Sequence, residues 1–210
     1  MPDVTIDQHP ELDARIFVTR FPDQLGNLSA ASEFSHWFDL QAAAPLQTSD
    51  EVRAKVRELF RLGGFKPTGR NKPASEYLVR AANENRLASI NPAVDFCNIV
   101  SLHSGLPISV IDLSRSEGDL SIRLAEENTT YVFNASGQEI DVGKLICLFD
   151  SRGPCANAIK DSQRTKTADL TTETLSVIWG TRQLPGRSEE ANRWYQELLS
   201  RFGAELDTIR

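Results

Sequence analysis

Two polar residues, Asp95 and Asn98, stand out as candidates for binding chemistry. They lie in the segment INPAVDFCNIVSLHSGLPISVID (residues 90–112), and most of their neighbours in its first half are apolar. A spacing of three residues puts two side chains on one face of a helix. Since buried amide and carboxyl groups need hydrogen-bond partners, two interpretations are open. Either both residues tie the helix to the loop around Gly105 and Pro107, or Asn98 lines a pocket and binds an amino acid.

Two basic stretches are the other candidates, because they could hold an anionic ligand. In RGPCANAIKDSQRTKT (residues 152–167), Gly153 and Pro154 predict a tight loop with exposed N–H groups, followed by several cations among hydroxyl residues. Residues 61–80 carry five basic residues and one acidic residue, a local net charge of +4. The alternative is that both stretches are simply solvated surface. The cations considered as ligand contacts are Lys66, Arg70, Lys72, Arg80, Arg164 and Lys166.

The common catalytic and metal-binding signatures are absent from the sequence. It has no GxSxG elbow, P-loop, GxGxxG or HExxH motif, and its three cysteines show no CxxC spacing. His103 falls at the end of a predicted helix, where the dipole favours a cation. Cys97 and Cys147 have apolar neighbours and are predicted to pack in the core. We therefore expect neither a metal nor a cofactor.

Helices at both ends of the chain and strands between them predict an α+β fold with mostly antiparallel sheet. Apolar spacing and caps predict helices from 49 to 62, after Ser75, from Pro92 to Gly105, and from Ser188 to Gly203. Short runs rich in Val, Ile and Leu predict strands at 14–21, 107–113, 119–125, 130–134, 145–150 and 174–180. We expect residues 1–48 to be a segment packed on a main domain formed by residues 49–210.

Composition and charge restrict the class of protein. The 210 residues are 40% hydrophobic and 25% charged, which is typical of a globular domain. The net charge of −6 means that any contact with nucleic acid must come from a local patch. No apolar run is long enough to cross a membrane, and the first residues lack a secretory signal, so we expect a cytoplasmic protein.

The order of motifs resembles a known family. The pattern Asn-Pro-x-Val-Asp-x-x-Asn (residues 91–98), a Gly-x-Pro turn and a strand that ends in Asp112 resembles the core of the B3/B4 domain of phenylalanyl-tRNA synthetase beta subunits. The resemblance extends over roughly residues 60–183. It implies a layered sandwich of mostly antiparallel sheets with helices on one side. It also implies a pocket that receives a misactivated amino acid on the end of a tRNA.

The resemblance also implies roles for individual residues. Cys97 and Asn98 stand where the family has Thr and Asn, and Ser109 stands where many bacterial synthetases have His. Gly180 corresponds to a Glu that recognises the hydroxyl of tyrosine, so the amino acid edited here is expected not to be tyrosine and to be more apolar.

The resulting expectation is a free-standing aminoacyl-tRNA editing protein that hydrolyses the ester of a mischarged tRNA. Asn98, Ser109 and Gly153 would position the ester and a water, and Asp95, Cys97 and Gly180 would contact the amino acid. The six cations named above would contact tRNA, and an aminoacyl-tRNA synthetase is a further candidate partner. Two alternatives remain open: a binding module that does not hydrolyse, and an enzyme that acts on a free amino-acid derivative.

Overall fold

A computed structural model describes residues 3–30, 32–69 and 71–208 of the chain. The strands are β1 (Val4–Ile6), β2 (Leu12–Arg20), β3 (Ile108–Asp112), β4 (Leu120–Leu124), β5 (Thr130–Val132), β6 (Glu139–Asp141), β7 (Ile146–Asp150), β8 (Gly153–Asn157), β9 (Glu173–Thr181) and β10 (Glu205–Thr208). The helices are α1 (Asp50–Arg61), α2 (Ala74–Asn83), α3 (Pro92–Ser104) and α4 (Arg187–Phe202). Short 3-10 helices are η1 (Leu25–Asn27), η2 (Ser32–Phe38), η3 (Leu113–Arg115) and η4 (Gln163–Thr165).

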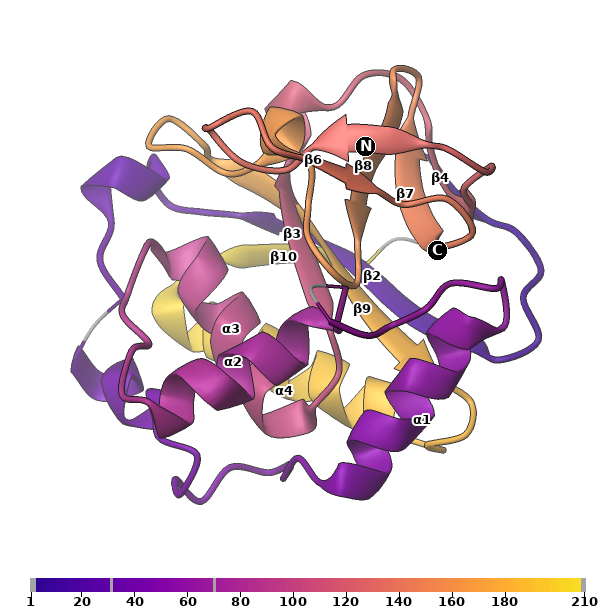
Figure 1. The fold of residues 1–210 in the computed structure, drawn as a ribbon. Coiled ribbons are helices and arrows are strands. Elements are labelled where there is room, and N and C mark those ends of the chain that lie inside the picture. The colour runs from indigo at the N-terminus through magenta and orange to yellow at the C-terminus, as the bar shows by residue number, and fades with distance from the viewer. Residues whose placement is uncertain (1–2, 31, 70, 209–210) are drawn as a thin grey trace.

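Two four-stranded sheets form the centre of the molecule, and the helices gather on one side of them (Figure 1). One sheet has the order β10-β2-β9-β3 and is antiparallel throughout. The other has the order β1-β4-β7-β8 and is antiparallel except for the β1–β4 pair. A separate hairpin joins β5 and β6. The predicted α+β class with mostly antiparallel sheets is confirmed.

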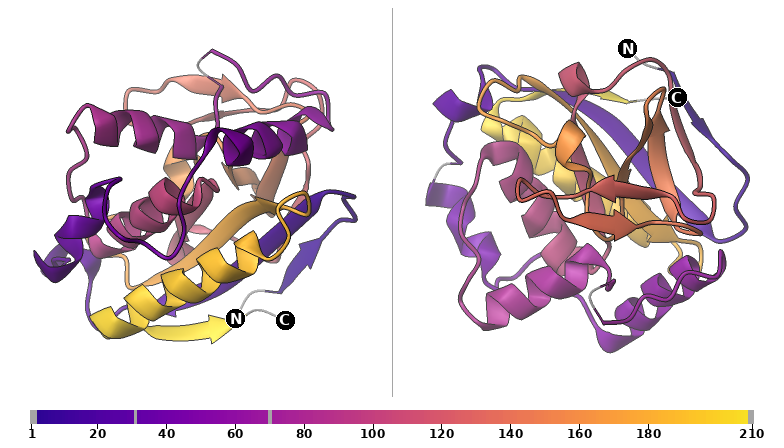
Figure 2. Two further views of the ribbon diagram at one scale, coloured as in Figure 1. Left: turned by 90° about the horizontal axis from the view of Figure 1, so that it is seen from below. Right: turned by 45° about the horizontal axis from the view of Figure 1, so that its top comes forward.

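Residues from the beginning of the chain belong to both sheets. The nine residues of β2 pair with the nine residues of β9, from Leu12 opposite Thr181 to Arg20 opposite Glu173. On its other side, β2 pairs with β10, so strands from the two ends of the chain lie side by side (Figure 2). The segment predicted to pack on the main domain therefore supplies an interior strand of its sheet.

Local sequence signals explain most helix boundaries. Ser49 caps α1 by accepting a hydrogen bond from Val52 N, and Asn91 caps α3 by accepting one from Val94 N. Gly105, with a φ of 70°, ends α3 in the left-handed conformation that the sequence predicts.

Two predicted caps are wrong. Ser75 lies inside α2, which begins after Pro73, and Ser188 lies inside α4, which begins after Gly186. Proline fixes a backbone dihedral angle and glycine allows a positive one, so each can start a helix without a capping side chain.

The tight loop predicted at Gly153 and Pro154 is a strand. Both residues belong to β8, where Gly153 pairs with Asp150 and Pro154 with Phe149. The turn lies two residues earlier, at Ser151 and Arg152. Pro154 fits because β8 is an edge strand, where a missing N–H costs no ladder bond.

Helix α3 is the most deeply buried helix in the described chain. It contacts α2, α4 and β3, and eleven of its thirteen residues are buried.

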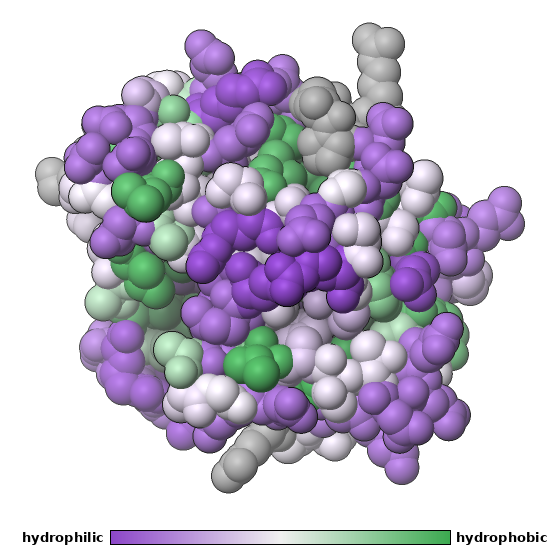
Figure 3. Space-filling view, turned by 90° about the horizontal axis from the view of Figure 1, so that it is seen from above, coloured by the Kyte–Doolittle hydropathy of each residue, from purple (hydrophilic) through white to green (hydrophobic). Residues whose placement is uncertain are grey.

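Outside the core, hydrophilic side chains form a broad band across the face shown in Figure 3, and hydrophobic side chains form separate patches. The large apolar side chains that reach solvent come from different elements: Ile6, Leu62, Tyr77, Ile90, Leu124, Val132 and Leu170.

Candidate functional site

A cavity of about 430 Å³ opens beside α3, and Asn98 forms part of its wall. Its walls come from α2, α3, the start of β3 and the segment after β8, and it is open to solvent. Its walls are mostly apolar, and Tyr77, Asn98 and Lys160 bring the polar atoms. The lining residues are Ala74, Tyr77, Leu78, Asn98, Ile108, Ile159 and Lys160. An apolar cavity with a few polar groups is typical of a site for a small organic ligand.

Asp95 and Asn98 have different environments, although they lie one turn apart. The Asp95 side chain is buried, and its carboxylate accepts hydrogen bonds from Ser89 Oγ and, at 2.8 Å, from Ile90 N. Burial raises the pKa of Asp95, and the hydrogen bonds oppose that rise. Asp95 therefore fastens α3 to the preceding loop, whereas the half-buried Asn98 faces the cavity.

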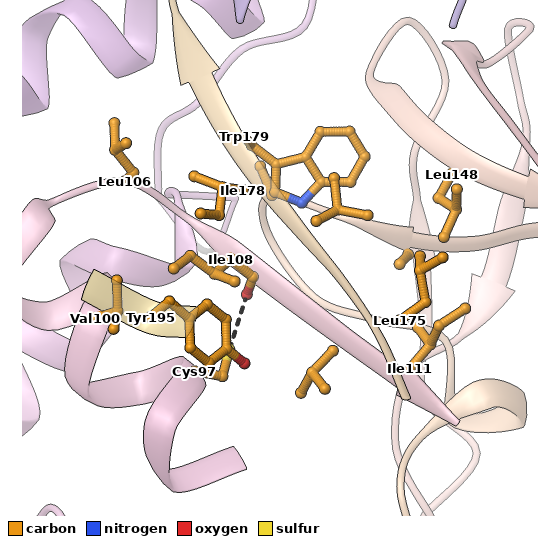
Figure 4. Close-up of a cluster of buried hydrophobic side chains, with 14 of the residues drawn as sticks. Cys97, Val100, Leu106, Ile108, Ile111, Leu148, Leu175, Ile178, Trp179 and Tyr195 are labelled. Carbon is orange, nitrogen blue, oxygen red and sulfur yellow. Dashed lines mark hydrogen bonds between the residues drawn. The ribbon is translucent and has the colours of Figure 1, made fainter. Parts of the chain in front are cut away.

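Cys97 packs in the core, as its apolar neighbours predict. Its thiol donates to the carbonyl oxygen of Ile108 at 3.5 Å, and the side chain lies beside Tyr195 (Figure 4). Burial raises the pKa of the Cys97 thiol far above its usual range, so the thiolate is not available at neutral pH. Cys97 does not line the cavity, and the structure gives it no role in contacting a ligand there.

Ser109 lies behind the cavity wall. Successive residues of a strand point to opposite faces, so Ile108 faces the cavity and Ser109 faces the other sheet. Its oxygen lies 2.7 Å from Asp161 Oδ1 and 3.0 Å from Asn157 O, and it accepts a hydrogen bond of 2.9 Å from Trp179 Nε1. Because Ser109 is buried and bonded on all of these sides, its position supports the wall and gives no contact with a ligand.

Asp161 belongs to the hydrogen-bond network behind the cavity wall, and no motif in the sequence indicates this position. Its carboxylate binds Ser109 Oγ and accepts a 3.3 Å hydrogen bond from Asn157 N. Burial raises its pKa to about 6. In the sequence it is one acid in a basic stretch, and only the fold shows that Ser109 lies against it.

The same network fixes the segment that presents Ile159 and Lys160 to the cavity. Asn157 Oδ1 accepts from Ile159 N at 2.7 Å and from Lys160 N at 3.1 Å. The Tyr131 hydroxyl donates to the Lys160 carbonyl and accepts from Asn157 Nδ2. The main-chain N–H and the main-chain carbonyl of Lys160 are therefore both held by side chains of this network.

The predicted cations do not form one surface. Arg164 makes a two-point ion pair of 2.6 and 2.8 Å with the buried carboxylate of Asp150, so its charge is neutralised inside the protein. Lys166 donates to the Phe133 carbonyl at 2.6 Å. Lys66 is exposed, and Arg70 lies outside the described residues.

The two remaining cations line a separate groove of about 490 Å³ between α2 and the start of α1. These cations are Lys72 and Arg80, and Arg80 Nε lies 2.9 Å from Glu84 Oε1 in an ion pair. Tyr77 lines this groove and the cavity beside Asn98, so the two are neighbours across α2.

Neither glycine of the predicted site lines the cavity. Gly153 starts β8 and Asn157 ends it, so the two lie roughly 13 Å apart along the strand. Gly180 lies against α4, where an added Cβ would be 1.8 Å from Ser188 Oγ and 2.8 Å from Asp13 O. Gly180 thus allows helix and sheet to approach closely, and its position leaves no room for a bound amino acid.

No group of three His, Cys, Asp or Glu side chains among the described residues is placed to hold a metal ion. Within the same residues, every helix is too short or too polar to span a membrane.

Comparison with known proteins identifies the family. A family model described as the B3/4 domain matches residues 64–193, which include every residue that lines the cavity. The chain belongs to the B3/4 domain family. The resemblance seen in the sequence is therefore confirmed, and α2, α3 and β3 to β9 all lie within the matched region of this B3/4 domain.

The curated relatives are phenylalanine–tRNA ligase beta subunits. That of Pseudomonas syringae pv. syringae is 31% identical over 110 residues, which cover 49% of this chain and 14% of the relative. That of Pseudomonas putida is 34% identical over 70 residues, which cover 33% of this chain and 9% of the relative. The B3/4 chain thus spans a small part of the length of the relatives it matches.

A solved structure shares the fold. It is an N-terminal fragment of the phenylalanyl-tRNA synthetase beta subunit from Pyrococcus horikoshii, with a TM-score of 0.50 at 10% identity. The match covers 97% of this chain and 50% of the fragment. The fold therefore extends to residues outside the matched family region, including β2 and β10.

Proposed function

We propose that this B3/4 domain is an aminoacyl-tRNA deacylase, which removes wrongly attached amino acids from tRNA in the cytoplasm. The observation that carries the proposal is the cavity beside α3, where Asn98 and Lys160 bring polar groups to apolar walls. The relatives are subunits of a tRNA ligase, which supports tRNA as the source of the substrate. A synthetase that produces mischarged tRNA is the natural partner.

The reaction needs positioning more than strong acid–base catalysis. An aminoacyl ester is already activated, so a held water can attack its carbonyl carbon while the bond to the ribose oxygen breaks. The proton from the water passes to the leaving ribose oxygen. The Asn98 amide can orient the water, and the Lys160 ammonium can stabilise the negative charge that develops on the carbonyl oxygen.

The walls of the cavity favour an aliphatic side chain. Leu78, Ile108 and Ile159 enclose the space with branched apolar groups, and no carboxylate lines it within the described residues. A buried polar group on the ligand would lose hydrogen bonds to water without gaining enough in return. We therefore propose that the substrate carries an apolar amino acid and not tyrosine.

A panel of mischarged tRNAs tests the proposal. We expect the purified protein to deacylate one or more tRNAs that carry an aliphatic amino acid. Asn98→Ala should lower kcat/KM by about 100-fold, in line with the loss of one positioned hydrogen-bond donor. Asn192→Ala, on α4 and outside the cavity, is the matched control and should keep wild-type activity. Wild-type turnover by Asn98→Ala would overturn the assignment of the site.

A binding module without hydrolysis is the second candidate. It is favoured by the absence of any Asp, Glu or His among the residues that line the cavity. A stable amide analogue of the aminoacyl end distinguishes the two functions, because a binding module would hold it while deacylating no tRNA of the panel.

An enzyme for a free amino-acid derivative would differ in its salt response. Affinity for tRNA falls with rising salt as counterions are released. A salt-independent KM would favour the free derivative over tRNA.

A further inference from the structure

The β5–β6 hairpin forms a two-stranded sheet of its own, yet it contacts the segment that follows β8 at three points. The Tyr131 hydroxyl donates to the Lys160 carbonyl, and the Lys160 ammonium lies over the Phe133 ring. The third contact is a hydrogen bond from Lys166 to the Phe133 carbonyl. We propose that this hairpin positions the Lys160 ammonium for ester hydrolysis, with Phe133 as the main positioning residue. The inference rests on the proposed function and adds Tyr131 and Phe133 as residues that act through Lys160.

The main chain of Lys160 has a fixed position. Its carbonyl accepts from the Tyr131 hydroxyl, and its N–H donates to Asn157 Oδ1 at 3.1 Å. Tyr131 is buried and its hydroxyl also accepts from Asn157 Nδ2, so it cannot turn away without breaking two hydrogen bonds. The point from which the Lys160 side chain starts is therefore set by this network.

The Phe133 ring restrains the far end of the same side chain. A lysine side chain is a flexible four-carbon stem, so an ordered main chain alone does not fix its ammonium. Lys160 Nζ lies 3.9 Å from the centroid of the Phe133 ring, within the range of cation–π attraction. The ring is held in turn, because the Phe133 carbonyl accepts from Lys166 Nζ at 2.6 Å and the Phe133 N–H donates to Gln138 O at 2.9 Å. Both ends of the Lys160 side chain thus have a defined place.

Phe133 acts on a ligand through Lys160 and not by direct contact. In the described part of the chain, Lys160 lines the cavity beside Asn98 and Phe133 does not. An ammonium that already has its place stabilises developing charge without reorganisation at the moment of reaction. Stabilisation that is confined to the transition state changes kcat. Loss of the Phe133 ring should therefore slow the chemical step and leave the binding of substrate unchanged.

Deacylation kinetics test the positioning role. On the mischarged tRNA that the wild type hydrolyses best, Phe133→Leu should lower kcat by about tenfold or more while KM stays within about twofold. Tyr131→Phe removes only the hydroxyl and should show the same split between kcat and KM. Phe133→Tyr keeps an aromatic ring beside the ammonium and should restore kcat to within about twofold of the wild type.

Phe149→Leu is the matched control. The Arg123 guanidinium lies 3.7 Å from the centroid of the Phe149 ring, so this variant breaks a contact of the same kind. Neither Arg123 nor Phe149 is among the described residues that line the cavity beside Asn98. We expect Phe149→Leu to keep the wild-type kcat.

A second measurement locates the Lys160 side chain without turnover. In protein with 13C-labelled lysine, the ε-methylene resonance of Lys160 is assigned in the NMR spectrum by its absence from Lys160→Arg. Protons over the face of an aromatic ring resonate upfield, so we expect an upfield shift that Phe133→Leu abolishes. Phe133→Tyr and Phe149→Leu should retain this shift.

The outcomes separate the two proposals. An unchanged kcat in Phe133→Leu, or a Lys160 resonance that does not move in this variant, would overturn the positioning role while deacylation by the wild type left the proposed function intact. A fall in kcat that Phe133→Tyr does not restore, or that Phe149→Leu shares, would also overturn it, because loss of stability would then account for the effect. No deacylation of any tRNA in the panel by the wild type would overturn both.

Discussion

The carboxylate of Asp161 should make the stability of the protein depend on pH. Burial raises its pKa from the ordinary 3.8 to about 6, although the hydrogen bond with Ser109 opposes that rise. The folded state therefore holds the proton more tightly than the unfolded chain does. This contribution to the free energy of unfolding is complete below pH 4 and is lost as the pH rises through about 6. A difference of about two pH units corresponds to at most about 3 kcal/mol, because the half-buried side chain keeps some contact with water.

Asp161→Asn removes the titration and keeps an oxygen that can accept from Ser109 and from the backbone N–H of Asn157. We expect the free energy of unfolding of the wild type, minus that of the variant, to fall by up to about 3 kcal/mol between pH 4 and pH 7. Urea denaturation at half-unit steps of pH measures both proteins. Asp119→Asn, at an exposed position before β4, is the control and should follow the wild type. Parallel curves for wild type and Asp161→Asn would refute the account of the network.

Three further substitutions test the fold around the site. Arg164→Met leaves the buried Asp150 carboxylate without its ion pair and should cost about 3–5 kcal/mol in urea denaturation, whereas a loss below 1 kcal/mol would contradict the role given to the pair. Gly180→Ala forces a methyl group against Ser188 and should lower the melting temperature, with an overpacking cost of about 1–3 kcal/mol; an unchanged melting temperature would mean that α4 moves freely. Phe96→Ala removes a ring whose centroid lies 4.9 Å from that of Phe34, and it should lower the free energy of unfolding by about 3–5 kcal/mol. An unchanged stability in calorimetry would exclude that packing role.

The sequence predicts the helices well because their signals are local. Pro92 and Gly105 mark the ends of α3 in the sequence, and the structure adds Asn91 as its capping residue. The strands rich in Val, Ile and Leu are also recognisable. These features depend on residues that lie within a few positions of one another.

The other site residues depend on contacts between distant parts of the chain. All five residues of β3 are buried, so the sequence does not show that Ile108 faces the cavity while Ser109 faces the other sheet. The resemblance implies that Gly180 contacts the amino acid, but the approach of α4 decides what surrounds this glycine. Arg164 looks like a free surface cation until the fold brings Asp150 within 2.6 Å.

Edge strands of both sheets escape prediction from the sequence, for a physical reason. The strand β8, with the sequence GPCAN, contains both Gly and Pro and forms because β7 offers it a partner. The strand β10, with the sequence ELDT, is short and polar, and it forms along β2. Strands of this kind are determined by pairing more than by propensity.

The position of β2 between β9 and β10 has a consequence for biosynthesis. Its partners on β9 are encoded more than about 150 residues later, and a ribosome that adds 5–20 residues per second needs roughly 8–30 seconds to supply them. Throughout that interval the backbone of Ile16, Phe17 and Val18 has no native strand to pair with, and an unpaired apolar strand readily recruits the wrong one. The nascent polypeptide thus exposes an unpaired apolar strand until β9 and β10 have been synthesised.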